Sequence, residues 1–122
     1  LTGQLNMDQV STLLAQADIG VAPYYGWVEY SGLKLFDYKS AGLATIASGE
    51  NGQPTTLRHG VTGWIVPPGD TSALCKAILL LANDGDLRRK IGRAARIEAE
   101  QRHTWRHTVL EISAVLSRMR RA

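Results

Sequence analysis

The sequence has one cysteine, Cys75, in 122 residues. A single cysteine excludes an intrachain disulfide, so a small fold held together by disulfides is excluded and a reducing compartment is expected. Cys75 lies inside an apolar helical pattern. This position predicts a small buried residue and not a reactive nucleophile.

Long hydrophobic runs are also missing. The longest apolar run, residues 77–82, falls far short of the roughly 20 residues that span a bilayer. No signal-peptide pattern opens the chain. We therefore expect a cytoplasmic protein, and we leave open a peripheral membrane contact of the full-length protein.

Aromatic residues are absent from the main basic cluster, at residues 88–96, although the net charge is +3. Because RNA and single-stranded ligands use aromatic side chains for stacking, we interpret the cluster as a solvated helix face and expect no nucleic acid partner. His103 and His107 are four residues apart, with Glu100 and Glu111 at helical spacing. Thr104 interrupts the helical pattern between the two histidines, and we expect no metal.

The chain does contain a regular alternation of short apolar runs and amphipathic segments, with 44% hydrophobic and 20% charged residues. Such a composition and length fit one small domain with a core. The runs at residues 19–23, 43–48 and 63–66 predict buried parallel strands. The predicted helices begin near Asn6, residues 31–33, Asp70, Gly85 and Thr104, with one helical turn at residues 55–59. This alternation predicts an α/β, Rossmann-like fold with a parallel sheet, helices on both faces and basic helices at the end.

Two of these helices carry clear apolar stripes, which we expect to face the core. The stripe of the helix that follows Asp70 consists of Leu74, Ala77, Ile78 and Leu81. The stripe of the last helix consists of Val109, Ile112, Leu116 and Met119.

The stretch from Glu29 to Gly42 combines a loop carboxylate, a glycine, a helix start and a second acid. A helix start offers unpartnered N–H groups and a partial positive charge, so residues 30–34 suit an anion such as a diphosphate. Asp37 lies on the face of Leu33, about 6 Å further along the axis, within reach of a ribose. Glu29 lies on the other side of the anion position.

Each of these residues also has a plainer interpretation. Glu29 alone would be a solvated loop acid, and Asp37 a residue of a polar helix face. Their spacing around Gly32 favours a ligand site, although Gly32 also suits a simple turn. For Lys34, an ordinary exposed charge remains the preferred interpretation.

The segment EYSGLKLFDYKSAG, with seven residues between Glu29 and Asp37, resembles the acidic pair motif of retaining GT-B glycosyltransferases. That large family includes many sucrose, lipid and polysaccharide glycosyltransferases. Residues 59–70, HGVTGWIVPPGD, are similar to a second stretch of the same family. Together the two motifs resemble the nucleotide-sugar-binding C-terminal domain of the group 1, family 4-like members.

The resemblance implies glycosyl transfer with retention from a nucleotide-diphosphate sugar, without a metal or other cofactor. It implies that Glu29 contacts the donor sugar near the reacting carbon and that Asp37, where the family usually has Glu, binds the ribose. The implied diphosphate ligands are Ser31, the amides of Gly32 and Leu33, and Lys34.

The resemblance also implies a partner, the acceptor-binding N-terminal half, against which the last helix often packs in the family. We expect residues 1–122 to form a single partial domain, truncated relative to a whole GT-B half and inactive by itself. The alternative is a truncated, non-catalytic nucleotide-binding or interaction module of the same fold.

Overall fold

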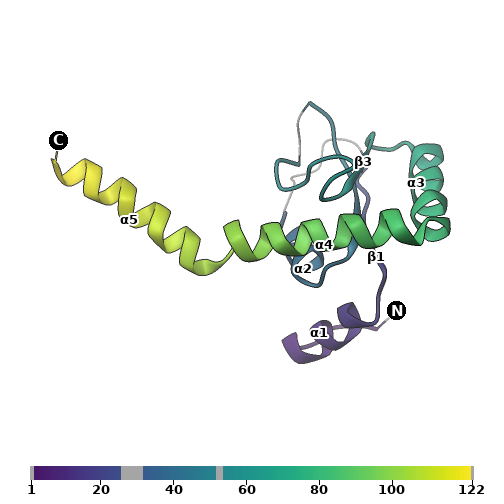
Figure 1. The fold of residues 1–122 in the computed structure, drawn as a ribbon, viewed down its shortest axis with the longest axis horizontal. Coiled ribbons are helices and arrows are strands. Elements are labelled where there is room, and N and C mark those ends of the chain that lie inside the picture. Colours follow the sequence, from purple (N-terminus) through teal and green to yellow (C-terminus); the bar gives the residue numbers. More distant parts are fainter. Residues whose placement is uncertain (1, 26–31, 52–53, 122) are drawn as a thin grey trace.

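The computed structural model describes residues 2–25, 32–51 and 54–121, and the main chain in these ranges forms a small α/β domain with a helix extending from it (Figure 1). Three strands form one parallel sheet in the order β1-β2-β3. The elements are α1 (Met7–Ala15), β1 (Ile19–Ala22), α2 (Leu33–Ser40), β2 (Ala44–Ser48), β3 (Trp64–Val66), α3 (Thr71–Asn83), α4 (Gly85–Arg102) and α5 (Trp105–Arg121).

The central strand, β2, is buried along its whole length because helices cover both faces of the sheet. On one face, Ile46 packs with residues of α3 and α4, namely Ala77, Leu81 and Ile91. On the other face, Ala47 packs with Leu35 of α2, Ala22 and Leu57. The predicted fold class, a Rossmann-like parallel sheet with helices on both faces, is therefore confirmed.

α2 lies close against the sheet because β1 contains a glycine where the helix crosses it. A Cβ atom on Gly20 would come within 2.6 Å of the Tyr38 ring. α4 lies equally close to the turn that joins α2 to β2, because a Cβ atom on Gly92 would overlap the carbonyl oxygen of Gly42. Gly42 itself has a φ of 73°, in the left-handed region that favours glycine at the end of a helix.

The predicted helix starts near Asn6, Asp70 and Gly85 are confirmed, and each is capped by a side chain. Asn6 and Gln9 form a reciprocal capping box at α1. The carboxylate of Asp70 accepts from the amide of Ala73 at 2.8 Å, and that of Asp84 from Leu87 at 2.9 Å. Residues 55–59, predicted as a helical turn, instead form a non-helical turn that ends in a bridge between His59 and Gly63.

In α3, the burial predictions for Cys75 and Ile78 are wrong. Cys75 is exposed, because α3 turns its Leu74–Ala77–Leu81 side to the sheet and the next residue after Leu74 points about 100° away from it. Ile78, at the margin of this stripe, is 36% exposed.

The apolar stripe of α5 is also exposed. Its four predicted core residues are between 54% and 69% exposed, because α5 extends away from the sheet (Figure 1). These residues are Val109, Ile112, Leu116 and Met119. α1 likewise has no buried residue. Within the described ranges, no helix combines the length and the hydropathy needed to cross a membrane.

Candidate functional site

The candidate site lies at the edge of the sheet where all three strands end. Parallel strands place their carboxyl ends, here Ala22, Ser48 and Val66, on the same side. Open α/β sheets bind ligands in this position. α2 begins at this edge because the chain leaves β1 there and returns along the sheet as a helix.

No side chain of the described residues caps the N-terminus of α2. Gly32 is the N-cap residue, with φ −72° and ψ 1°, and it has no side-chain oxygen to accept from the first amides. Leu33, the first residue of the helix, is 73% exposed. The helix therefore presents the positive end of its dipole at an accessible surface, as an anion-binding site requires.

Tyr24 fixes the start of the segment that joins β1 to α2. Its backbone N–H donates to the Ser48 Oγ at 2.9 Å, and its carbonyl accepts from the amide of Gly69 at 3.0 Å. The Lys34 ammonium lies 5.5 Å from the centre of the Tyr24 ring, a cation–π distance. The two ends of the segment therefore meet at the sheet edge, and the exposed Lys34 places its charge there.

A hollow of about 380 Å³ opens beside this edge, on the side of the sheet covered by α3. Most of its surface is apolar, and two tyrosines contribute to it. Its lining consists of Pro23, Tyr24, Tyr25, Ser48, Pro67, Gly69, Asp70, Thr71 and Leu74.

Asp37 lies one turn along α2 from Leu33 and is exposed. It borders a second hollow, between α1 and α2, to which Met7, Val10 and Arg96 also contribute. The described residues offer no ion-pair partner to its carboxylate. The predicted catalytic residue Glu29 and the predicted diphosphate ligand Ser31 lie outside the described residues.

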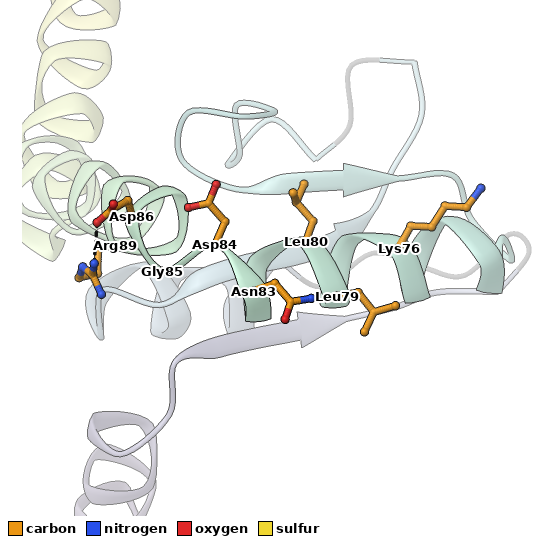
Figure 2. A pocket seen from close by; sticks show the side chains of 8 residues that line it. All are labelled: Lys76, Leu79, Leu80, Asn83, Asp84, Gly85, Asp86 and Arg89. Atoms are coloured by element: carbon orange, nitrogen blue, oxygen red, sulfur yellow. Dashed lines mark hydrogen bonds and ion pairs between the residues drawn. The ribbon is translucent and has the colours of Figure 1, made fainter.

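A third hollow surrounds the junction of α3 and α4 (Figure 2). Three of its charged groups already have partners in the chain: Asp84 caps α4, and Arg89 pairs with Asp86 at 2.6 Å. It lies at the end of α3 remote from the carboxyl edge, because α3 starts just after β3 ends and runs back along the sheet. We therefore do not assign the site to this hollow.

A buried charge network behind α2 was not predicted. Lys39 is completely buried, and its Nζ donates to the Glu98 Oε2 at 2.8 Å and to the Thr56 carbonyl at 2.7 Å. Arg58 Nε lies 3.3 Å from the other carboxylate oxygen of Glu98. The sequence held one signal: Lys39 is four residues after Leu35, on the buried face of the helix.

This network shifts the pKa of two groups. Burial by itself raises the pKa of Glu98, but the hydrogen bond from Lys39 and the charges of Lys39 and Arg58 bring it below its ordinary value of 4.5. Burial also lowers the pKa of His103, and the Lys39 charge lowers it further. The His103 ring packs edge-on against Phe36 of α2, with the ring centres 5.1 Å apart.

Glu98→Gln is expected to remove an acid-sensitive part of the stability. A carboxylate with a depressed pKa stabilises the fold above its unfolded-state value of 4.5, and this contribution is lost as the pH falls through the lower pKa of the folded state. The free energy of unfolding of the parent should therefore be higher than that of the variant. This difference should be largest near neutral pH and should shrink below pH 4.5. Urea unfolding between pH 7 and pH 3 measures this difference.

Glu100→Gln is the matched control, because Glu100 lies on the same helix and pairs with Arg96 at 2.6 Å but is exposed. It should show little of this pH dependence. A constant difference between Glu98→Gln and the parent across the pH range would show that Glu98 is not preferentially ionised in the fold.

The metal and nucleic acid alternatives receive no support from the geometry. The described residues bring no three His, Cys, Asp or Glu side chains together at a possible metal site. The Nδ1 atom of His107 lies 2.7 Å from the Thr104 Oγ1 instead. In the basic cluster, Arg88 and Arg96 donate to main-chain carbonyls of the chain itself, those of Leu81 and Ser40.

A parallel sheet with helices on both faces defines a Rossmann-like domain. The chain belongs to the family described as glycosyl transferases group 1, whose model matches residues 1–98. It is similar to sulfoquinovosyl transferase SQD2 of Arabidopsis thaliana, with 32% identity over 114 residues that cover 91% of this chain and 22% of that protein. The chain spans 20% to 30% of the length of the curated relatives that it matches.

Solved structures show the same fold. Sucrose-phosphate synthase from Thermosynechococcus elongatus superposes with a TM-score of 0.84 at 25% identity, over 97% of this chain and 29% of that one. HepE from Anabaena, in complex with UDP and glucose, superposes with a TM-score of 0.75 at 24% identity, over 88% of this chain and 29% of that one. The predicted family, the C-terminal domain of a group 1 glycosyltransferase, is therefore confirmed.

Proposed function

We propose that this chain is the donor-binding part of a retaining glycosyltransferase and that it binds a nucleotide-diphosphate sugar at the N-terminus of α2. One observation carries the proposal: this N-terminus is exposed at the carboxyl edge of the sheet, and no described side chain caps it. Membership of the group 1 glycosyl transferases supports it. The UDP and glucose in the complex of the fold relative HepE are consistent with such a ligand.

In this proposal the diphosphate lies against the start of α2. The amides of Gly32 and Leu33 and the hydroxyl of Ser31 donate to its oxygens, and Lys34 adds a full positive charge. The cation–π contact with Tyr24 holds that charge at the sheet edge. Fixed donors of this kind stabilise the charge that grows on a departing diphosphate better than water does.

Asp37 and Glu29 contact opposite ends of the donor in this proposal. Asp37 accepts hydrogen bonds from the ribose hydroxyls, one helical turn from the diphosphate. Glu29 contacts the sugar near the carbon at which the bond to the diphosphate breaks and the bond to the acceptor oxygen forms. The acceptor binds to the other half of the full-length protein.

A second candidate is a nucleotide-binding module without transfer activity. Asp37 favours it, because the family usually has Glu at this position and an aspartate reaches less far. Glycosyl transfer by the full-length protein distinguishes the two candidates, because the module would bind the nucleotide and transfer nothing.

Asp37→Ala is expected to weaken nucleoside diphosphate binding to this chain by about tenfold or more, because it removes a hydrogen bond to a charged group, whose contribution to the binding free energy corresponds to such a factor. Titration calorimetry with UDP, GDP and ADP gives the affinity and identifies the base. Asp37→Glu should bind as well as the parent or better, since the longer acid is the usual residue of the family.

Asp86→Ala is the control, because Asp86 is an exposed helix carboxylate far from the sheet edge. It should leave the affinity unchanged. Failure of the parent chain to bind any of the three nucleotides would overturn the proposed function, and a large loss in Asp37→Glu would overturn the ribose assignment.

A further inference from the structure

Lys39 is the most completely buried charged side chain among the described residues, with an exposed fraction of 0%. A lone ammonium in such a place would be strongly destabilising, and burial is tolerated only with charge and hydrogen-bond partners. Two acceptors supply them, Glu98 Oε2 at 2.8 Å and the Thr56 carbonyl at 2.7 Å. An apolar side chain could fill the same space and would need no charged or hydrogen-bonding partners. Packing alone therefore does not explain why this buried residue is a lysine.

The contacts of Lys39 join three parts of the molecule. Lys39 lies in the last turn of α2, Glu98 in α4, and Thr56 in the segment that follows β2. The carboxylate of Glu98 also interacts with Arg58 and with the buried Thr62 hydroxyl. The Thr62 Oγ1 in turn accepts from the Arg58 amide at 3.0 Å. We call these five residues the Lys39 network.

The network lies on the side of α2 opposite to the donor-binding residues. Leu35 and Lys39 are the buried residues of the helix and lie one turn apart on one face. With 100° per residue, Leu33 and Asp37 point to the other side. The contacts of the buried face therefore set the rotation of this eight-residue helix about its axis. That rotation determines the direction in which Asp37 points on the opposite face.

We infer that Lys39 and Glu98 are positioning residues of the donor site: their buried ion pair fixes the rotation of α2, and so the direction in which Asp37 and the first amides face the donor. Hydrogen bonds between charged groups are short and directional, whereas apolar contacts tolerate several arrangements. The Thr56 bond extends the same constraint to the segment that leaves the carboxyl end of β2. The inference rests on the proposed function, because it concerns the same donor site.

The test uses a double variant, Lys39→Met with Glu98→Gln, in the 122-residue chain. Removing both charges avoids leaving one buried without its partner, and the side chains keep most of their volume. We expect a cooperative melt like that of the parent, but an affinity for the nucleoside diphosphate that is lower by about tenfold, measured by calorimetry well below the melting temperature. A tenfold loss corresponds to about 1.4 kcal/mol.

The matched control is Asp86→Asn with Arg89→Met, which removes an ion pair of 2.6 Å from the exposed start of α4. It should change neither the melt nor the affinity. In the full-length protein, the Lys39 and Glu98 double variant should raise the donor KM, because Asp37 no longer faces the ribose, and should also lower kcat, because the displaced first amides of α2 stabilise the departing diphosphate less.

The outcomes separate the two proposals. If the parent binds the nucleotide and the folded double variant binds it equally well, the positioning role is wrong and the proposed function stands. If the parent does not bind, both are overturned. If the double variant does not melt cooperatively, the single variant Glu98→Gln is used instead, because its amide oxygen can still accept a hydrogen bond from Lys39. A lower nucleotide affinity of this folded variant supports the positioning role. An unchanged affinity overturns it.

Discussion

Gly92→Ala is expected to destabilise the domain by about 3 kcal/mol, although alanine is the better helix former by about 1 kcal/mol. The added Cβ would overlap the carbonyl oxygen of Gly42 and come within 3.1 Å of its carbonyl carbon. Both are main-chain atoms in the turn between α2 and β2, so the clash is relieved only if α4 moves off the sheet. Thermal and urea unfolding of the 122-residue chain measure the loss.

Gly85→Ala is the matched control in the same helix. A Cβ there meets the Arg89 side chain, at 3.1 Å from the nearest guanidinium nitrogen, and that side chain is flexible and exposed. This variant should be neutral or slightly more stable than the parent, by up to about 1 kcal/mol. Equal effects at the two glycines would mean that helix propensity decides both and that α4 does not lie tightly against Gly42.

Glu29→Gln in the full-length protein is expected to lower kcat by roughly a hundred- to a thousand-fold, with little change in the donor KM. Positive charge grows at the reacting sugar carbon as the diphosphate departs. In the proposed site the Glu29 carboxylate stabilises that charge, whereas the amide has the same shape without the charge. Initial rates over a range of donor concentrations give kcat and KM separately.

Two variants bracket this result. Asp37→Ala should mainly raise KM, since a ribose contact is made in the ground state and the transition state alike. Asp86→Asn should change neither parameter, as Asp86 is an exposed acid of α4, remote from the carboxyl edge of the sheet. An unchanged kcat in Glu29→Gln would remove Glu29 from the mechanism.

Local signals in the sequence were sufficient for most of the fold. Asn6 and Asp70 are residues whose side chains satisfy helix amides a few positions away, so their role depends on nearby residues alone. The predicted runs at residues 19–23 and 43–48 differ from β1 and β2 by one residue each. The site edge followed from the β1-α2-β2 part of this alternation, because a helix that returns the chain to the starting end of the sheet makes the two strands parallel.

Features that depend on distant partners were not predictable in the same way. Lys39 is buried because Glu98, 59 residues later, lies over it. The apolar stripe of α5 shows which face can pack, but a pattern within one helix does not contain the surface that covers it. Cys75 is exposed for a similar reason, since it points about 100° away from Leu74 and the pattern of α3 does not show where the covered side ends.

The complete burial of β2 has a consequence for how the molecule opens in solution. The strand is paired with β1 on one side and β3 on the other, Ile46 and Ala47 with both, and helices cover its two faces, so its amides should exchange with deuterium more slowly than those of other segments. Amides of α1 and α5 should exchange orders of magnitude faster, because no residue of α1 and none of residues 105–120 is buried. Both terminal helices would then open and close many times while the strand end beside the start of α2 keeps its shape.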